Sequence, residues 1–326
     1  MSSHVRPRAR IGAGLGLAVA LLLAACSTGN EEPSGGDAGG DAAATGGSDG
    51  CTIGMTQINQ TAVFFTQMNE GVEQAAAEAG CEITIANANN DSARQSSDIE
   101  NFVAQGVDGI IVVAIDVNGV MPAVEAAQGE GIPVVAIDAE LEGVETFVGV
   151  DNEAAGAEAG QWMIDEGLVE GQRYGVVDAK NSFIQNQREE SFRGVIDAAG
   201  AIYTQSVNGD NVQEKAATAA QDLVTAQPDL DFVYTTGEPA TVGAVAALAG
   251  NTDTVIIGWD LTKEVIGGID SGLVRAVIQQ NPKQEGIEAV NELKAILDGA
   301  EPQGFIGVPI EIVTADNVDE YRSIFP

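Results

Sequence analysis

Short apolar runs alternate along this chain with amphipathic segments, and the alternation predicts its architecture. The run Pro133–Ile137 is apolar throughout and is followed by Asp138. It predicts a buried parallel strand with an acid at its carboxyl end. Residues 65–79 have apolar side chains at helical spacing and precede Gly80, which is typical of a helix and its stop. Strands that alternate with helices in this way predict parallel sheets covered by helices on both faces.

The same two patterns recur over most of the chain. They predict strands at residues 52–58, 83–86, 109–115, 133–137, 146–150, 174–178, 201–207, 231–235, 254–259, 274–279 and 305–313. They predict helices at about residues 65–79, 97–105, 120–128, 187–199, 213–227, 240–249, 263–270 and 283–298.

Two pairs of acidic residues stand at matching positions in the two halves of the chain. Asp138 and Asp260 each close an apolar run, and 122 positions separate them. The same offset relates Asp116 to Glu238. The repeat predicts an α/β protein of two similar, doubly wound parallel-sheet lobes. Because ligands of open α/β sheets bind outside the carboxyl ends of the strands, we expect acids on both walls of a cleft between the lobes.

Residues 1–25 have the composition of a targeting segment. Three arginines precede the apolar stretch 11–23, which is too short for an ordinary membrane span. Small residues lead directly to Cys26, and this sequence resembles a bacterial lipoprotein processing site. The resemblance implies cleavage before Cys26 and lipidation of its thiol. A plain secretory signal with an incidental cysteine is the alternative.

A polar segment follows the targeting sequence. Residues 27–50 contain no large apolar side chain, so we expect a flexible tether at 26–50 ahead of a folded domain at 51–326. The chain is also strongly acidic, with 49 Asp and Glu against 14 Lys and Arg, and a formal net charge of −35. Such a surface repels phosphate backbones, which argues against a nucleic-acid partner. A solvated extracellular surface accounts for most of this charge.

The two cysteines of the predicted folded domain stand at equivalent places. Cys51 and Cys81 each lie two residues before an isoleucine that opens a predicted strand. In a β-α-β unit these strands are parallel neighbours, so their starts lie side by side. We therefore predict a disulfide and an oxidising compartment, with two buried free thiols as the alternative.

The residue types leave little room for covalent chemistry. The only histidine is His4, inside the targeting segment. Its position excludes a Ser-His-Asp or Cys-His nucleophile system and a His-ligated zinc from the mature chain. No phosphate-binding G-x-x-x-x-G-K-[ST] sequence occurs. We expect no catalytic residue, no metal and no cofactor, although the acid pair Asp138 and Asp260 leaves a surface glycosidase as an alternative.

A series of landmarks carries a family resemblance. In chain order they are Thr52–Met55, Phe64-Phe65, Pro133–Asp138, Arg188, Val255–Asp260 and Gln280. Together they resemble the extracytoplasmic solute-binding proteins of bacterial sugar ABC transporters, of the ribose and galactose type. The resemblance spans Cys51 to about Tyr321.

The resemblance implies a fold and a function. The fold is that of type I periplasmic binding proteins, with two lobes joined by three hinge crossings. The N-lobe is then about 51–150 plus 281–310, and the C-lobe about 151–280 plus 311–326. The implied protein is an extracytoplasmic monomer, either lipid-anchored on the outer face of the cell membrane or periplasmic. It closes on a monosaccharide or sugar alcohol without altering it and delivers it to an ABC permease.

The resemblance also assigns binding roles. The predicted aromatic contacts, which would cover the C–H faces of a sugar, are Phe64, Phe65 and Trp259. The predicted polar contacts, whose planar groups can bond two adjacent hydroxyls, are Asp138, Arg188, Asp260 and Gln280.

Each of these residues has a structural alternative. Asp138 and Asp260 could be helix N-caps. Either Phe64 or Phe65 could be core, and so could Trp259. Gln280 could be a hinge residue without ligand contact. Arg188 could pair with a neighbouring glutamate on a solvated helix face.

The chain departs from the family pattern at several positions. Ala139 stands where such sugar binders commonly have Arg, Gly237 and Ala62 where they have Asn, and Asn211 where they have an aromatic residue. Ribose or galactose is therefore not assigned as the ligand. The second-rank ligand candidates that could fill these gaps are Asn59, Glu140, Asn186, Asn211 and Glu238.

Two rival functions belong to other classes. An autoinducer-like or sensory sugar receptor without a transport role would have the same sequence features. A transcriptional regulator with a similar core is excluded by the targeting segment and the lack of a basic helix-turn-helix region.

Overall fold

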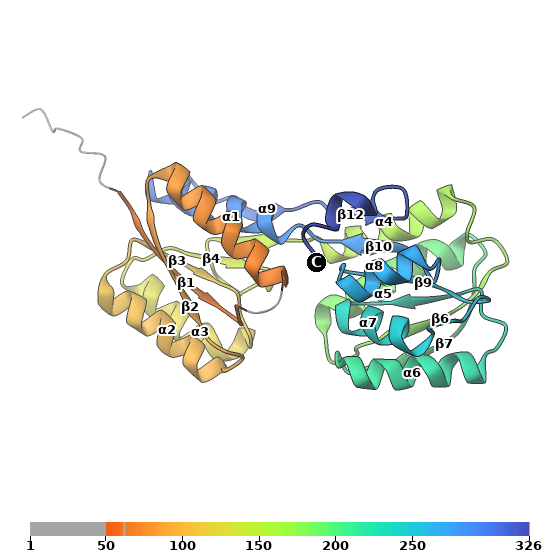
Figure 1. The fold of residues 1–326 in the computed structure, drawn as a ribbon. Helices are drawn as coiled ribbons and strands as arrows, with labels where there is room; N and C mark the ends of the chain where they lie inside the picture. The colour runs from red at the N-terminus through yellow and green to blue at the C-terminus, as the bar shows by residue number, and fades with distance from the viewer. Residues whose placement is uncertain (1–49, 61–62, 326) are drawn as a thin grey trace, which may run out of the picture. The chain divides into compact units, whose positions relative to one another are not determined.

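The strands of the protein form two separate sheets. The computed structural model describes residues 50–60 and 63–325 (Figure 1). Within them, each sheet has six strands, in the orders β11-β5-β4-β3-β1-β2 and β12-β10-β9-β8-β6-β7. The predicted targeting segment 1–25, residues 26–49 of the predicted tether, and Cys26 with its predicted lipidation lie outside the described residues.

The first sheet is parallel throughout. Its strands are β1 (Thr52–Gln57), β2 (Glu82–Asn87), β3 (Gly109–Val112), β4 (Val134–Ile137), β5 (Thr146–Gly149) and β11 (Gly304–Gly307). Helices α1 (Val63–Ala79) and α9 (Pro282–Leu297) pack on one face and α2 (Ser92–Gln105) and α3 (Val117–Gly129) on the other (Figure 1). Four-residue strands such as β3 and β4 are buried completely, as expected for a parallel sheet covered on both faces.

The second sheet repeats this arrangement with one antiparallel edge. Its strands are β6 (Arg173–Asp178), β7 (Ile202–Asn208), β8 (Phe232–Thr235), β9 (Val255–Trp259), β10 (Val274–Gln279) and the antiparallel β12 (Glu311–Val313). Helices α4 (Asn152–Asp165) and α5 (Phe183–Ala198) cover one face. Helices α6 (Gln213–Ala226), α7 (Glu238–Ala247) and α8 (Lys263–Asp270) cover the other, and a 3-10 turn, η1 (Val318–Tyr321), follows β12.

The chain passes between the sheets three times: after β5, after β10, and between β11 and β12. Asp151 follows the first passage and caps α4, its carboxylate accepting from the amide of Ala154. The third passage corrects the predicted single strand 305–313. Residues 304–307 join the first sheet and residues 311–313 the second. Pro309, which has no N–H to donate to a ladder, stands between the two paired segments.

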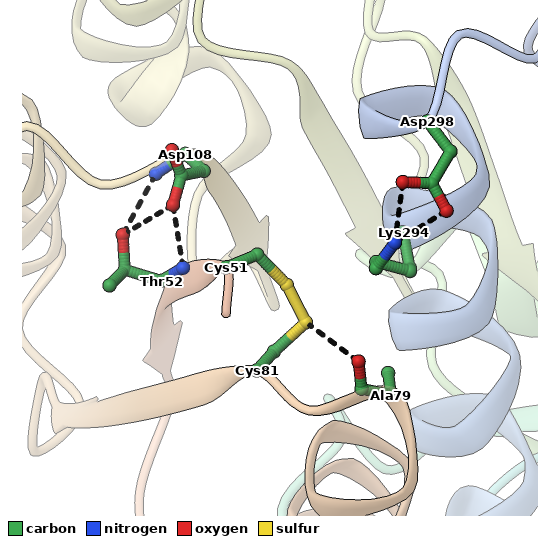
Figure 2. The surroundings of a disulfide bond; sticks show 7 residues. All are labelled: Cys51, Thr52, Ala79, Cys81, Asp108, Lys294 and Asp298. Atoms are coloured by element: carbon green, nitrogen blue, oxygen red, sulfur yellow. Dashed lines mark hydrogen bonds and ion pairs between the residues drawn. A yellow bond between two sulfur atoms is a disulfide. The ribbon is translucent and has the colours of Figure 1, made fainter. Parts of the chain in front are cut away.

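The predicted disulfide is present. Cys51 and Cys81 immediately precede β1 and β2, and their Cα atoms are 4.4 Å apart (Figure 2). The register pairs Thr52 with Glu82, which places the two strand starts side by side as the β-α-β reasoning requires. Among residues 50–60 and 63–325, no helix combines the length and apolar content needed to cross a bilayer.

Candidate functional site

Asp138 and Asp260 have the same local structure at the ends of β4 and β9. Both are half-buried, and both have left-handed backbone conformations, with φ of 65° and 60°. The amide of Asp138 donates to Val148 O and that of Asp260 to Ile278 O, each at 3.0 Å on the neighbouring strand. The N-cap alternative is wrong for both. Helix α8 is capped by Thr262, and β4 leads to β5 with no helix between.

Arg188 holds the polar groups of the second lobe together. It is 5% exposed and projects from α5, which approaches α4 closely at Gly156. Its Nε donates to Asn152 Oδ1 at 2.7 Å, its Nη1 to Thr236 O at 3.4 Å, and its Nη2 to Gln280 Oε1 at 3.1 Å. Gln280 Nε2 in turn donates to both carboxylate oxygens of Asp260, at 3.0 and 3.1 Å. Arg188, Gln280 and Asp260 thus form one connected polar group. Asn152 also belongs to it, although the sequence reasoning did not predict it as a site residue.

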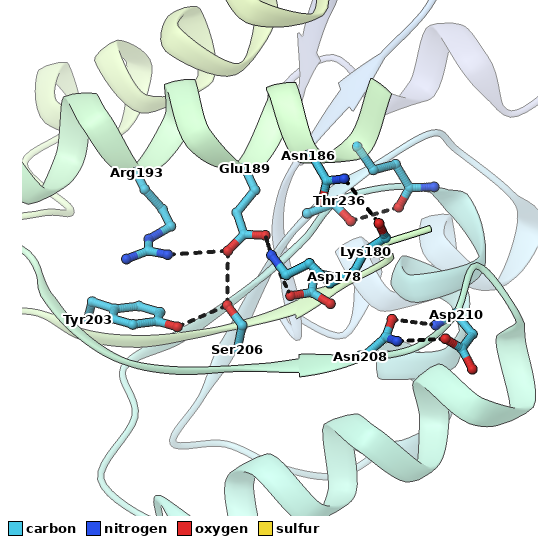
Figure 3. Close-up of polar contacts among 11 residues, drawn as sticks. Asp178, Lys180, Asn186, Glu189, Arg193, Tyr203, Ser206, Asn208, Asp210 and Thr236 are labelled. Carbon is cyan, nitrogen blue, oxygen red and sulfur yellow. Dashed lines mark hydrogen bonds and ion pairs between the residues drawn. The ribbon is translucent and has the colours of Figure 1, made fainter. Parts of the chain in front are cut away.

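The alternative in which Arg188 pairs with Glu189 or Glu190 on a solvated helix face is wrong, because Arg188 is buried and Glu189 faces a different cluster. Its carboxylate accepts from Lys180 at 2.6 Å, from Arg193 at 3.3 Å and from Ser206 at 2.9 Å (Figure 3). These bonds use both carboxylate oxygens. Arg188 points in another direction from α5, about 100° round the helix, and reaches Thr236 and Gln280 directly after β8 and β10.

Trp259 lies beneath the arginine. Its side chain is 0% exposed, and the Arg188 guanidinium carbon is 3.7 Å from the centroid of its ring. The indole N–H donates to the hydroxyl of Tyr234 at 2.8 Å. The ring therefore supports Arg188 from the core, by a cation–π contact. A direct contact of Trp259 with a ligand stays a prediction.

The predicted residues of the first lobe lie at the start of α1. Phe64 and Phe65 are half-buried and meet edge to face, with ring centroids 5.3 Å apart. Both pack partly against the core beside β1. Phe64 lines a cavity of about 420 Å³ together with Asp260 and Glu238.

Asp138 lines a different cavity. Its volume is about 760 Å³, and Glu140, Asn152 and Phe183 also face it. Phe183 begins α5 and is 75% exposed, although the sequence reasoning did not single it out. The two strand-end acids therefore line separate cavities in the described structure, and their contact with one ligand in a shared cleft stays a prediction.

The remaining second-rank candidates are bonded locally. Asn211 Oδ1 accepts from Gln185, Asn186 Nδ2 donates to Lys180 O, and Asn59 Nδ2 donates to Asn90 Oδ1. Their contact with a ligand stays a prediction. No group of three His, Cys, Asp or Glu in the described part of the chain is placed to hold a metal ion.

The electrostatics link the two acids through Arg188. Burial raises the pKa of Asp138; Arg188 opposes that rise and Asp260 adds to it. Burial likewise raises the pKa of Asp260, opposed by Arg188 and by the hydrogen bonds from Gln280. Each of the two acids is thus close enough to Arg188 for their charges to interact. Asp138 and Asp260 are also close enough to affect each other. A pair of acids around one cation can accept hydrogen bonds from ligand hydroxyls.

The sequence reasoning missed a third acid, Glu285 in the first turn of α9. It is 0% exposed, and neither carboxylate oxygen has a hydrogen-bond partner among residues 50–60 and 63–325. Burial raises its pKa well above the usual range, Asp138 and Asp260 add to the rise, and Arg188 opposes it. The sequence does indicate that Glu285 is buried. It lies four and eight positions before the buried Ala289 and Leu293, on the apolar stripe of the helix.

Comparison with known proteins gives a consistent result. Residues 53–301 match the model of the periplasmic binding protein domain. The ribose import binding protein RbsB of Bacillus subtilis is 29% identical over 81% of this chain and 87% of its own length. A xylitol-binding protein of Mycolicibacterium smegmatis is 28% identical over 93% of this chain and 84% of its own.

A solved structure shares the fold. AraP, an arabinose-binding protein from Geobacillus stearothermophilus, superposes with a TM-score of 0.78 at 21% identity, over 83% of this chain and 99% of its own. The match covers both six-stranded lobes.

Proposed function

Because this chain belongs to the periplasmic binding protein family, we propose that it binds a monosaccharide or sugar alcohol for an ABC importer. It is a binding protein and not an enzyme. The relatives named for ribose and xylitol support this ligand class. The observation that carries the proposal is the arrangement of Asp138 and Asp260 at equivalent strand ends, coupled through the charge of Arg188.

The chemistry of these groups suits a polyhydroxylated ligand. Carboxylates accept hydrogen bonds and a guanidinium donates them, so together they match hydroxyls, which do both. Asp260 and Arg188 are already oriented by Gln280, so little rotamer freedom is lost when a ligand binds. Phe64 offers an apolar face in the same cavity as Asp260. A ligand that contacts both lobes would stabilise the form in which they close on it.

The site residues set limits on the ligand. Ala139 has no side-chain donor next to Asp138. Ligand hydroxyls must therefore donate most of the hydrogen bonds that Asp138 accepts in the site. Ribose, another pentose or hexose, and a sugar alcohol all satisfy this requirement.

The domain boundaries remain those proposed from the sequence: an N-lobe of about 51–150 plus 281–310 and a C-lobe of about 151–280 plus 311–326. The pairing of β11 with β5 and of β12 with β10 supports them. We also propose that the mature protein begins at Cys26, is lipid-anchored there on the outer face of the membrane, acts as a monomer and delivers its ligand to a permease.

Thermal unfolding against a panel of sugars tests the function. D-ribose, L-arabinose, D-galactose and xylitol are added separately to residues 26–326 with Cys26→Ser, which removes the lipidation site. A ligand present at about 100 times its dissociation constant adds about 2.7 kcal/mol of stability. Asp260→Asn is expected to lose most of this gain, and Arg322→Ala, in a surface ion pair with Asp270, to keep it. The proposal fails if no carbohydrate or polyol raises the midpoint.

A further inference from the structure

Gly237 leaves a gap in the second lobe that another side chain fills. Gly237 caps α7 with φ of −172°, extended backbone that any residue adopts. The backbone therefore does not require glycine here. A Cβ at this position would lie 2.8 Å from Cδ and Nε2 of Gln185, so the space is already occupied by the Gln185 amide.

Gln185 is held in that space by two hydrogen bonds. It is 8% exposed, on α5 one turn before Arg188. Its Oε1 accepts from Thr236 Oγ1 at 2.7 Å, and its Nε2 donates to Asn211 Oδ1 at 2.8 Å. Both bonds fix the plane of the amide.

These bonds extend the polar group around Arg188. Thr236 O accepts from Arg188, which leads through Gln280 to Asp260. Gln185 therefore connects the exposed Asn211 to the acid at the end of β9 through an unbroken series of polar contacts. Its chain neighbour Ile184 lines the cavity of Asp138, and Glu238, beside Gly237, lines that of Asp260.

Hydrogen-bonding capacity is left over at the end of this series. With its Oδ1 held by Gln185, Asn211 has a fixed orientation, and its two Nδ2 hydrogens make no hydrogen bond to the residues that the structure describes. Because Gln185 already restricts the side chain of Asn211, less rotamer freedom is lost when Asn211 donates to a ligand hydroxyl, so a ligand with that hydroxyl gains more affinity than it would from a mobile amide.

We propose that Gln185 is a positioning residue that determines ligand specificity by orienting Asn211 and Thr236. Gly237, just after β8, has no side chain, and the side-chain amide of Gln185 on α5 takes its place. The ligand then carries a hydroxyl for Asn211 in addition to those for Arg188 and Asp260. This inference rests on the proposed sugar-binding function.

The test is a double-mutant cycle on the full folded domain, with Gln185→Ala, Gly237→Ala and both together. Dissociation constants for D-ribose, L-arabinose, D-galactose and xylitol are measured by calorimetry. Gln185→Ala is expected to weaken binding of the favoured ligand about tenfold. The ratio of its dissociation constant to those of the other ligands is expected to change by about fivefold. Gly237→Ala displaces the Gln185 amide, so it is expected to weaken binding in the wild type and to add nothing in the Gln185→Ala background.

A rescue and a control separate positioning from simple damage. Gln185→Ala with Gly237→Asn returns an amide to the vacated space and is expected to recover affinity. Gln161→Ala, an exposed glutamine on α4 that bonds only Asp165 among the described residues, is expected to leave affinity and ligand ratios unchanged.

The outcomes are distinguishable. If a sugar binds the wild type and Gln185→Ala binds the whole panel as the wild type does, the inference is overturned and the proposed function stands. Equal weakening of every ligand without rescue by Gly237→Asn also overturns it. If no panel member binds the wild type, the proposed function and the inference fall together.

Discussion

The guanidinium of Arg188 lies over the indole of Trp259, with 3.7 Å from its central carbon to the ring centroid. The ring is wholly buried, while the arginine above it reaches Asn152, Thr236 and Gln280. A core residue and a site residue are thus stacked, so the core packing directly sets the position of the cation. The consequence is that changes beneath Arg188 should alter binding as well as stability.

Trp259→Phe and Trp259→Leu should separate these two effects. Phenylalanine keeps an aromatic face but loses the bond to Tyr234, which should cost about 1–3 kcal/mol of unfolding free energy and leave affinity within about threefold. Leucine also removes the cation–π contact, so affinity should fall about tenfold. Chemical denaturation and sugar titration measure both. Equal affinities for the two variants would contradict a supporting role for the ring.

Arg188→Lys should abolish most binding although the charge is kept. A lysine is a point charge on a flexible stem and cannot serve Asn152, Thr236 and Gln280 in one plane. Affinity for the favoured sugar should fall about 30-fold or more.

Arg193→Lys is the matched control for this change. Arg193 lies on the same helix, with its guanidinium carbon 3.7 Å from the Tyr203 ring centroid, in the cluster of Glu189. Its replacement should change affinity by no more than about threefold. A similar loss in both variants would mean that α5 as a whole, and not Arg188, supports binding.

Glu285→Gln should change the pH dependence of stability. The pKa of Glu285 is raised in the folded protein, by burial, Asp138 and Asp260, against the opposing charge of Arg188. The folded state then binds the proton more tightly than the unfolded state. Stability is therefore greatest below the unfolded pKa, about 4.3, and falls as pH rises through the folded pKa. Glutamine stays neutral, so the free energy of unfolding of the variant should increase relative to that of the wild type as pH rises.

Urea unfolding from about pH 4 to about pH 8 measures this difference. Glu288→Gln, half-exposed on the same helix and bonded to Gln284, is the control. A difference curve for Glu285→Gln that is flat with pH, or that slopes the other way, would rule out a raised pKa at Glu285.

Loss of the disulfide should reduce stability without altering the site. The bridge closes a separation of 30 residues, so Cys51→Ser with Cys81→Ser should cost about 3–4 kcal/mol. Both cysteines lie at the amino ends of their strands, whereas Asp138 follows the carboxyl end of β4, so sugar affinity should be retained. An intact mass that does not rise by about 2 Da on reduction would show that the bridge is absent in solution.

The sequence determined the alternation of elements and the placement of residues at strand ends. Buried parallel strands and amphipathic helices have local periodicities, so β4, β9 and the acids Asp138 and Asp260 could be located without a structure. The disulfide could also be predicted, because β-α-β connectivity alone places two strand starts together.

Only the tertiary structure decided what depends on contacts between distant segments. The break between β11 and β12 follows from the two sheets competing for one segment. The burial of Trp259 under Arg188, the orphaned carboxylate of Glu285, and the Gln185 amide in the space beside Gly237 depend on which helix faces meet which strand ends. No local pattern encodes these contacts, because each is set by the packing of side chains that lie far apart in the chain.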